Sequence, residues 1–359
     1  MGQKVTLKQI AELAGVSLTS VHRVLNGKDG CSEKVKQRIL QIAKEQGYDV
    51  NLAEFPMHKK VFHTALIFPR NDYKYQFFLQ RILDGYLQFR SDLNQFNVVF
   101  HEFYFDSVNA LPNSFLKQIY REQPIHFDGL VIYGIGLDAE CHTIINRLVG
   151  SGVQVVILER SPDELKDICS VEVNDTLAGN LAGEISSRYI HTPGTVAVVA
   201  QKLPGGDPNA KQFCKQIQKL RPELKFCVME LPLDRDQRNA IYQRLSGVSD
   251  LVGMYATCAR HTASMLRCIP DLPKLQAVIG SELFEESFLA LQDRLLDAVI
   301  DKRPEKIGYK AVHLLCNALL RKEQLPATYR VEPRIVLQSS SDIYYLDKEN
   351  CYGKTRYSE

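Results

Sequence analysis

The stretch from residue 5 to 27, VTLKQIAELAGVSLTSVHRVLNG, predicts two short helices joined by a tight turn. Thr6 and Gln9 have the spacing of a capping box, which satisfies free N–H groups at the start of the first helix. Gly15 suits the left-handed position that ends a helix, and Ser17 suits the N-cap of the next. This pattern is typical of a helix-turn-helix, so it predicts a unit that reads DNA.

Apolar residues at helical spacing give each of these helices one face for burial. The expected buried positions are Ile10, Leu13 and Ala14 in the first helix and Val21, Val24 and Leu25 in the second. A third helix is expected between its cap, Ser32, and Gly47. Its apolar stripe is Val35, Ile39, Ile42 and Ala43. The alternative interpretation is a small three-helix bundle with no nucleic-acid role.

Charge favours the DNA-binding interpretation. Residues 1–60 contain ten Lys or Arg and six Asp or Glu, a net charge of +4, whereas the rest of the chain carries a net −2. A basic N-terminal segment on a near-neutral chain fits phosphate contact better than it fits generic packing.

Length and composition fit a small domain followed by a large one. The chain has 359 residues, more than one ordinary domain needs, and 45% hydrophobic residues supply a core. No segment approaches the roughly 20 apolar residues of a membrane span, and no secretory signal opens the chain. The nine cysteines are scattered and include no C-x-x-C pair, which disfavours a disulfide framework and a zinc cluster. We therefore expect a cytoplasmic protein with no membrane partner.

Residues 5–48 closely resemble the DNA-binding headpiece of the LacI/GalR family of bacterial transcription regulators. The matching segments are VTLKQIAELAGVS, VHRVLNG and CSEKVKQRILQIAKEQGY. The resemblance continues more weakly to about Tyr345. It implies four parts, namely a helix-turn-helix headpiece at 1–48, a hinge linker at 49–60, an effector-binding and dimerisation domain at 61–346 and a tail at 347–359.

From residue 61 onward, short β-branched-rich runs alternate with helical patterns, which predicts a parallel, doubly wound α/β architecture. The expected strands are 63–69, 96–103, 128–134, 153–159, 194–200, 251–256 and 275–280. The expected helices are 76–94, 112–122, 138–150, 175–190, 208–220, 234–246 and 257–267.

The family resemblance implies that this body forms two lobes with parallel sheets, like a periplasmic sugar-binding protein. The expected N-lobe comprises about 61–160 plus 296–325, and the expected C-lobe about 161–291 plus 326–346. The crossings between lobes are expected near Glu159–Pro162, Leu291–Leu296 and Leu325. The complete expectation is a small all-α headpiece followed by a two-lobed α/β domain.

Three segments of the body carry the resemblance and favour ligand binding over catalysis. They are VEVNDTLAGNLAGE (171–184), VIGSELFEES (278–287) and DAVIDKRPEKIGYKAVHLL (297–315). Open α/β sheets bind ligands at the carboxyl ends of their strands. The loops that follow the strands are therefore the expected site.

Residues in those loops fit a sugar pocket, because aromatic faces pack on C–H surfaces while carboxylates and forked donors bind hydroxyls. Position after the strands singles out Asp72, Tyr73, Phe77, Phe78, Glu159 and Arg160. The resemblance adds Asp175, Asn209, Glu282 and Lys302, of which Glu282 replaces the usual Asp and Lys302 the usual Gln. At least one of the two phenylalanines is expected in the core instead. A surface ion pair is the alternative for Glu159 and Arg160.

The family's docking mode implies roles for the second helix. Leu18, Thr19 and Arg23 face base edges, and Ser20 lies nearer the phosphates. Arginine suits guanine, and leucine or the threonine methyl suits a thymine methyl. Leu18 could instead be partly buried under the first helix. His22 is expected either to touch a phosphate or to be a solvated side chain. The remaining predicted DNA-binding residues are Thr6, Ser17, Asn26, Asn51 and Met57.

The linker NLAEFPMHKK (51–60) departs most from the family, whose members carry an A-R-x-L hinge helix that enters the minor groove. Met57 holds the position of the wedging leucine. Pro56 costs roughly 3 kcal/mol inside a helix, and Glu54 would face phosphates. We therefore predict a short, shifted or absent hinge helix and weaker coupling between ligand and DNA.

The sequence contains none of the common phosphate-loop, nucleophile or zinc-protease motifs, so we expect no enzyme activity, cofactor or metal site. The expected function is a repressor of a carbohydrate operon that acts as a homodimer on a near-palindromic double-stranded DNA operator. One alternative is a regulator that senses a purine or a phosphorylated metabolite, favoured by Arg70, Arg160 and Lys302. The other is a solute-binding protein of the same fold without a DNA function.

Overall fold

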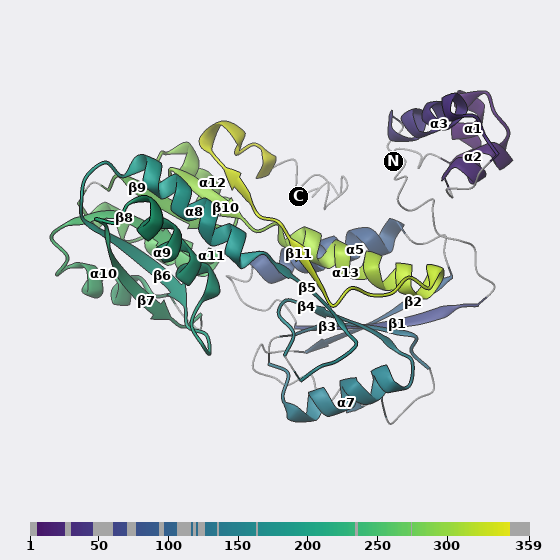
Figure 1. The fold of residues 1–359 in the computed structure, drawn as a ribbon, viewed down its shortest axis with the longest axis horizontal. Helices are drawn as coiled ribbons and strands as arrows, with labels where there is room; N and C mark the ends of the chain where they lie inside the picture. The colour runs from purple at the N-terminus through teal and green to yellow at the C-terminus, as the bar shows by residue number, and fades with distance from the viewer. Residues whose placement is uncertain are drawn as a thin grey trace, which may run out of the picture.

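The computed structural model describes residues 6–25, 30–45, 60–69, 77–92, 97–105, 116–117, 120, 126–134, 136–162, 164–233, 236–273 and 275–344. Within these ranges the chain forms an N-terminal three-helix unit and two α/β lobes, each built on a six-stranded sheet (Figure 1). The hinge prediction lies outside the described residues, as do Asn26, Asn51, Met57, Asp72 and Tyr73.

The N-terminal unit consists of α1 (Leu7–Ala14), α2 (Leu18–Leu25) and α3 (Glu33–Glu45). The predicted capping box is confirmed, because Gln9 N donates to Thr6 Oγ1 at 3.3 Å and Thr6 N donates to Gln9 Oε1 at 2.7 Å. Gly15 ends α1 with φ +64°, a conformation that glycine adopts without strain. Local sequence therefore sets the angle at which α2 leaves α1.

The core of this unit contains Ile10, Ala11, Ala14, Val21, Val24, Ile39 and Ala43. Leu13 is 51% exposed, so the prediction that it belongs to the buried face was wrong. At 100° per residue the buried face of α1 is centred between Ile10 and Ala14 on the side of Ala11, which turns Leu13 outward.

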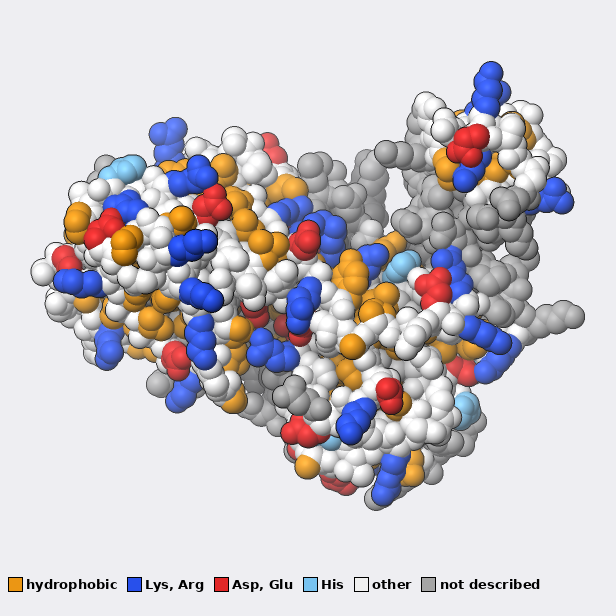
Figure 2. Space-filling model, viewed as in Figure 1, with side chains coloured by type: hydrophobic (Ala, Val, Ile, Leu, Met, Phe, Trp, Pro, Cys, Tyr) orange, Lys and Arg blue, Asp and Glu red, His pale blue; other side chains and the backbone are white. Residues whose placement is uncertain are grey.

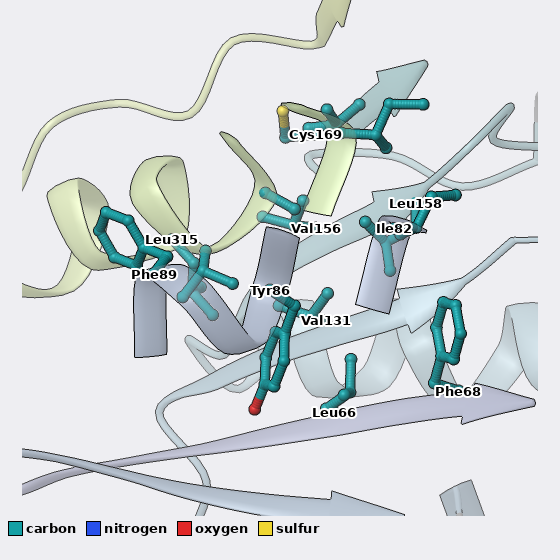
Figure 3. Close-up of a cluster of buried hydrophobic side chains, with 14 of the residues drawn as sticks. Leu66, Phe68, Ile82, Tyr86, Phe89, Val131, Val156, Leu158, Cys169 and Leu315 are labelled. Atoms are coloured by element: carbon teal, nitrogen blue, oxygen red, sulfur yellow. The ribbon is translucent and has the colours of Figure 1, made fainter. Parts of the chain in front are cut away.

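The first lobe contains a wholly parallel sheet with the strand order β11-β5-β4-β3-β1-β2. Its strands are β1 (Phe62–Pro69), β2 (Val98–Phe105), β3 (Gly129–Tyr133), β4 (Gln154–Leu158), β5 (Cys169–Val173) and β11 (Thr328–Val331). One face is covered by α5 (Phe77–Asp92), α13 (Pro304–Cys316) and the π-helical turn η2 (Asn317–Arg321), and the other by α7 (Ala139–Gly150). In Figure 3, Leu66, Val131 and Val156 from the strands lie around Ile82 and Tyr86 of α5, in one core cluster.

The second lobe contains a sheet with the order β12-β10-β9-β8-β6-β7. Its strands are β6 (Thr195–Gln201), β7 (Lys225–Leu231), β8 (Leu251–Ala256), β9 (Ala277–Ser281), β10 (Ala298–Asp301) and β12 (Arg334–Val336). One face is covered by α8 (Asp175–Tyr189) and α9 (Pro208–Leu220), and the other by α10 (Arg238–Leu245), α11 (Ala259–Leu266) and α12 (Glu285–Gln292). Two short 3₁₀ turns, η1 (Ile269–Asp271) and η3 (Gln338–Ser340), complete it.

The two-lobed α/β architecture is thus confirmed, and the seven predicted strands are present within two residues of their expected bounds. Sequence analysis missed β5, β7, β10, β11 and β12. The last of these runs antiparallel to β10, so the second sheet is mixed rather than wholly parallel.

Three crossings connect the lobes in the described chain, from β5 to α8, from β10 to α13 and from β11 to β12. The predicted crossings were wrong. Because β5 pairs with β4, the chain remains in the first lobe beyond Pro162. Leu291 and Leu296 lie in the second-lobe core, and Leu325 packs against the first-lobe core.

An ion-pair cluster joins the lobes beside the second crossing. The guanidinium of Arg81 on α5 donates to Leu283 O at 3.1 Å and to Glu305 Oε2 at 2.8 Å. It also lies 3.3 Å from Asp301 Oδ1 at the end of β10. The side chain of Asp301 is fully buried and accepts a second bond, of 2.9 Å, from Arg334 Nε. These contacts place the carboxyl end of β10 against the first lobe.

Candidate functional site

The exposed face of α2 is the first candidate site. Leu18 is 44% exposed, and Thr19 and Arg23 are exposed, whereas Val21 and Val24 face the core. Ser20 is half-buried, and its backbone N–H donates to Ser17 Oγ at 3.1 Å, as expected for an N-cap. The structure therefore leaves the residues predicted to read bases available to an external partner. His22 belongs to α2, but its side chain is not among those described.

The second candidate site, called the cleft below, is the region where residues at the carboxyl ends of strands from both lobes come together. Glu159 follows β4 of the first lobe, and Asp175 begins α8 after the first crossing. Glu282 follows β9, and Lys302 follows β10. Figure 2 shows acidic and basic side chains gathered where the two lobes adjoin. Four of the predicted ligand-binding residues therefore converge in space.

Lys302 lies at the centre of this cleft and is only 9% exposed. Its Nζ donates to Thr257 O at 2.7 Å, and it lies 3.4 Å from Glu282 Oε1 and 3.9 Å from Asp175 Oδ1. Burial alone would lower the pKa of Lys302, but the neighbouring carboxylates, Glu282 foremost, outweigh burial and raise it. The ammonium therefore stays charged.

The three carboxyl groups around Lys302 all hold protons more tightly than they would in water. Burial, followed by the charge of Asp175, raises the pKa of Glu159 to about 8. Burial also raises the pKa of Asp175 and of Glu282, in both cases against the opposing charge of Lys302. Glu159 and Glu282 both have positive φ, 71° and 60°, a conformation that non-glycine residues adopt mainly at special sites.

Three buried polar atoms in the cleft have no hydrogen-bond partner among the described residues. They are Glu159 Oε1, Glu282 Oε2 and Asn209 Nδ2. An unpaired buried polar atom typically costs about 1–3 kcal/mol, so it usually marks a missing water or ligand. The cleft is thus arranged to receive a polar molecule.

A hydrogen-bond network that sequence analysis missed orients Asn209. Asp207 caps α9 by accepting from Asn209 N at 2.9 Å, and it accepts from Thr257 Oγ1 at 2.6 Å. Tyr255 OH donates to Asn209 Oδ1 at 2.9 Å, which leaves the amide nitrogen for another acceptor. The available signal was position, since Asp207 and Thr257 follow β6 and β8 at the same edge as Glu282.

Two other predicted ligand-binding residues have described side chains, Phe78 and Arg160, and neither lies beside Lys302. Phe78 packs against the first-lobe core, which agrees with the expectation that one of the two phenylalanines is core. Phe77 lies at the start of α5, and its side chain is not among those described. The side chain of Arg160 is 65% exposed and 4.0 Å from Asp175 Oδ2, so it lies at the rim.

The raised pKa of Glu159 predicts how the ligand-free protein responds to pH. Its pKa moves from 4.5 to about 8 on folding, so the folded state binds the proton more tightly. The resulting stabilisation is fully present below pH 4.5 and is lost as pH rises through about 8. Glu159→Gln should therefore flatten the decline of melting temperature toward alkaline pH. Glu184→Gln, at an exposed carboxylate on α8, is the matched control. Identical pH profiles for wild type and Glu159→Gln would contradict this prediction.

No group of three or more His, Cys, Asp or Glu side chains suited to hold a metal ion occurs in the described part of the chain. Among the described helices, none is both long and apolar enough to cross a membrane.

Two family models match the chain. Residues 95–323 match the family described as "Periplasmic binding protein domain", and residues 6–51 match "Bacterial regulatory proteins, lacI family". The first match covers the body of both lobes, and the second covers α1 to α3.

Curated relatives align with parts of the chain. The ribitol operon repressor of Klebsiella aerogenes is 36% identical over 77 residues, which are 20% of this chain and 28% of the repressor. The probable HTH-type transcriptional repressor ExuR of Bacillus subtilis (strain 168) is 27% identical over 176 residues, 48% of this chain and 47% of that protein. The chain thus spans less than half the length of these relatives.

Solved structures share the fold of the two lobes. The arabinose binding protein AraP from Geobacillus stearothermophilus has a TM-score of 0.66 at 19% identity, covering 80% of this chain and 100% of its own. A solute binding protein from Bacillus halodurans C-125 with bound myo-inositol has a TM-score of 0.66 at 14% identity, covering 81% and 99%.

A putative LacI transcriptional regulator from Bacteroides fragilis also shares this fold. Its TM-score is 0.65 at 14% identity, and the match covers 80% of this chain and 99% of that one. The chain thus belongs to the periplasmic binding protein domain family through residues 95–323, and it carries at residues 6–51 a helix-turn-helix that matches the lacI family of bacterial regulatory proteins.

Proposed function

We propose that the protein is a sequence-specific transcriptional repressor whose binding to double-stranded operator DNA is controlled by a small carbohydrate. The observation that carries this proposal is the presence, in one chain, of a helix-turn-helix with an exposed reading face and a two-lobed domain with unpartnered buried polar atoms. A solute-binding protein would need only the second unit. In a solute-binding protein the helix-turn-helix would have no role.

The DNA-binding part of the proposal rests on the exposed residues of α2. Leu18, Thr19 and Arg23 contact base edges in the major groove, while Ser20 and His22 lie nearer the phosphates. In a homodimer, two such helices lie about one DNA turn apart, which predicts a near-palindromic operator. Residues 49–60 link the headpiece to the dimerising domain, with Met57 as the candidate minor-groove wedge.

The carbohydrate part of the proposal rests on the cleft. A hydroxyl group both donates and accepts, so a polyol satisfies the acceptors Glu159 Oε1 and Glu282 Oε2 and the donor Asn209 Nδ2. The ribitol, arabinose and myo-inositol in the names of similar proteins support this ligand class. The similarity to DNA-binding regulators also supports a binding role rather than catalysis, and a cytoplasmic location, as parts of this proposal.

The test is selection of bound fragments from the source genome by the full-length protein, repeated with a panel of sugars and polyols. We expect one enriched near-palindrome whose occupancy falls with one compound. Enrichment that no compound changes would contradict the carbohydrate part of the proposal. Failure to enrich any sequence would contradict the DNA-binding part and favour a solute-binding protein.

A further inference from the structure

The charged side chains of the cleft indicate which class of effector it accepts, an inference that rests on the proposed function. Glu159, Asp175, Glu282 and Asp207 contribute four carboxyl groups, and Lys302 is the cation buried among them in the described structure. We propose that Lys302 is an internal counterion, so that the cleft excludes effectors bearing a carboxylate or a phosphate and selects a sugar without an acidic group.

The N–H donors of Lys302 face protein acceptors. An ammonium group has three N–H donors. Thr257 O at 2.7 Å and Glu282 Oε1 at 3.4 Å lie within reach of two of them, and Asp175 Oδ1 lies 3.9 Å away, at ion-pair distance. A ligand anion that approached Lys302 would therefore come against the carboxyl groups of Glu282 and Asp175 and compete with them for the same cation.

Two other cationic side chains near the cleft also face protein carboxylates. Arg160 is solvent-exposed at the rim and faces Asp175 at 4.0 Å, where water screens its charge. Arg81 donates to Leu283 O and pairs with Asp301 and Glu305. Of the basic residues that favour a phosphorylated metabolite in the sequence, Arg160 and Lys302 therefore do not form an anion site, and Arg70 lies outside the described residues.

The unpartnered atoms point to the same conclusion. Glu159 Oε1 and Glu282 Oε2 are carboxyl oxygens, which accept hydrogen bonds when ionised. A ligand hydroxyl can donate to them, whereas a ligand carboxylate or phosphate brings another negative charge against Glu282 and Asp175, the carboxylates that pair with Lys302. Like charges brought together in a desolvated site cost several kcal/mol, which corresponds to about 100-fold or more in affinity.

The test compares ligands matched in stereochemistry and different in charge. Full-length protein is titrated calorimetrically with hexose, uronic acid and hexose 6-phosphate from the glucose, galactose, mannose and allose series, and with pentoses against their 5-phosphates. We expect the neutral member of the recognised series to bind about 100-fold more tightly than its anionic counterparts.

A variant reverses the preference if the counterion interpretation is correct. Glu159→Gln/Glu282→Gln removes two carboxyl groups with little change of shape, and one of them, that of Glu282, is an ion-pair partner of Lys302. Affinity for the anionic member should then rise roughly 10-fold or more while affinity for the neutral member falls. Glu184→Gln, which removes an exposed carboxylate from α8, should leave both affinities unchanged.

The melting temperature and operator-fragment binding of each variant are measured in parallel without ligand. Tighter binding of a uronate or a sugar phosphate than of the neutral sugar by wild-type protein would overturn the proposal. The proposal would also be overturned if the double variant folded and kept the wild-type preference between neutral and anionic ligands. It would equally be overturned if the wild-type protein bound no member of any ligand series. Loss of DNA binding with a preserved preference for neutral sugars would instead contradict the proposed function and leave the charge selection supported.

Discussion

Gly308→Ala is expected to destabilise the first lobe by about 3 kcal/mol, at the upper end of the usual cost of overpacking a core. Helices α5 and α13 approach each other with backbone in contact. A Cβ on Gly308 would lie 1.8 Å from Ile82 O and 2.8 Å from Tyr86 N, and a Cβ on Gly85 would lie 1.8 Å from Glu305 O. Backbone atoms inside a helix cannot move away cheaply, so the two helices must separate.

The control for this prediction is Gly150→Ala at the end of α7, where an added Cβ meets nothing within 4 Å. In an open helical position, alanine is normally the more stable residue by about 0.5–1 kcal/mol, so the two substitutions should have opposite signs. The measurement is the free energy of unfolding in urea. A Gly308→Ala protein as stable as wild type would show that the close crossing of α5 and α13 is wrong.

Separation of α5 and α13 should also affect the cleft. The chain enters α13 directly from Lys302, and Arg81 on α5 holds Asp301 at the end of β10. The close packing of α5 against α13 therefore sets the position of the start of α13, and of Lys302 before it, relative to the first lobe. Any folded fraction of Gly308→Ala should bind effector less tightly than wild type.

Arg23→Met is expected to weaken operator binding about 10-fold to 100-fold, because a bidentate arginine–guanine contact discriminates by roughly 1–3 kcal/mol. Arg23 is exposed on α2 beside the two buried valines, Val21 and Val24, that anchor the helix to the core. Binding to scrambled fragments should fall far less. The measurement is fluorescence anisotropy of the selected operator and of a scrambled fragment at one fixed salt concentration.

Arg38→Met on α3 is the matched control, because Arg38 is also exposed and carries the same charge. It should weaken both fragments alike and only slightly, as expected for loss of general phosphate attraction. If the two variants behaved alike on the two fragments, Arg23 would be a non-specific contact. The assignment of α2 as the reading helix would then be wrong.

The sequence predicted the N-terminal unit well because its signals are local. Thr6 with Gln9, Gly15, and Ser17 act within one turn of their own positions, and all four behave as expected. Leu13 was wrongly predicted to be buried because its large apolar side chain was counted and the small Ala11 was not. The buried face of α1 is formed by Ile10, Ala11 and Ala14. In a helix of only eight residues, one small buried residue shifts the face.

Four of the five missed strands share a physical cause, their shortness, which does not apply to the seven residues of β7. Strand β5 reads CSVEV, and β10, β11 and β12 are four, four and three residues long. Such short segments show too little periodicity to distinguish a strand from a loop. Two of the three crossings between the lobes follow β5 and β11. Because these strands were not predicted, the positions of those crossings were predicted wrongly as well.

Positions that match the family predicted the cleft better than residue type did. Asp175, Glu282 and Lys302 converge with Glu159, which was chosen by its place after a strand, whereas Phe78, chosen partly for its aromatic ring, packs against the core. Asp207, Thr257 and Tyr255 were missed because they act through hydrogen bonds between segments distant in sequence. A pattern search along the chain does not detect such contacts.

The measurement that tests the central claim most directly is the reciprocal coupling of effector and operator. The affinity for the operator is measured with and without saturating sugar, and the affinity for the sugar with and without saturating operator. Linkage requires the two ratios to be equal, and a typical coupling gives about 5-fold to 150-fold. We predict equal ratios at the lower end of this range, because Pro56 disfavours a full hinge helix. Operator affinity that is the same with and without a sugar shown to bind in the cleft would contradict the account.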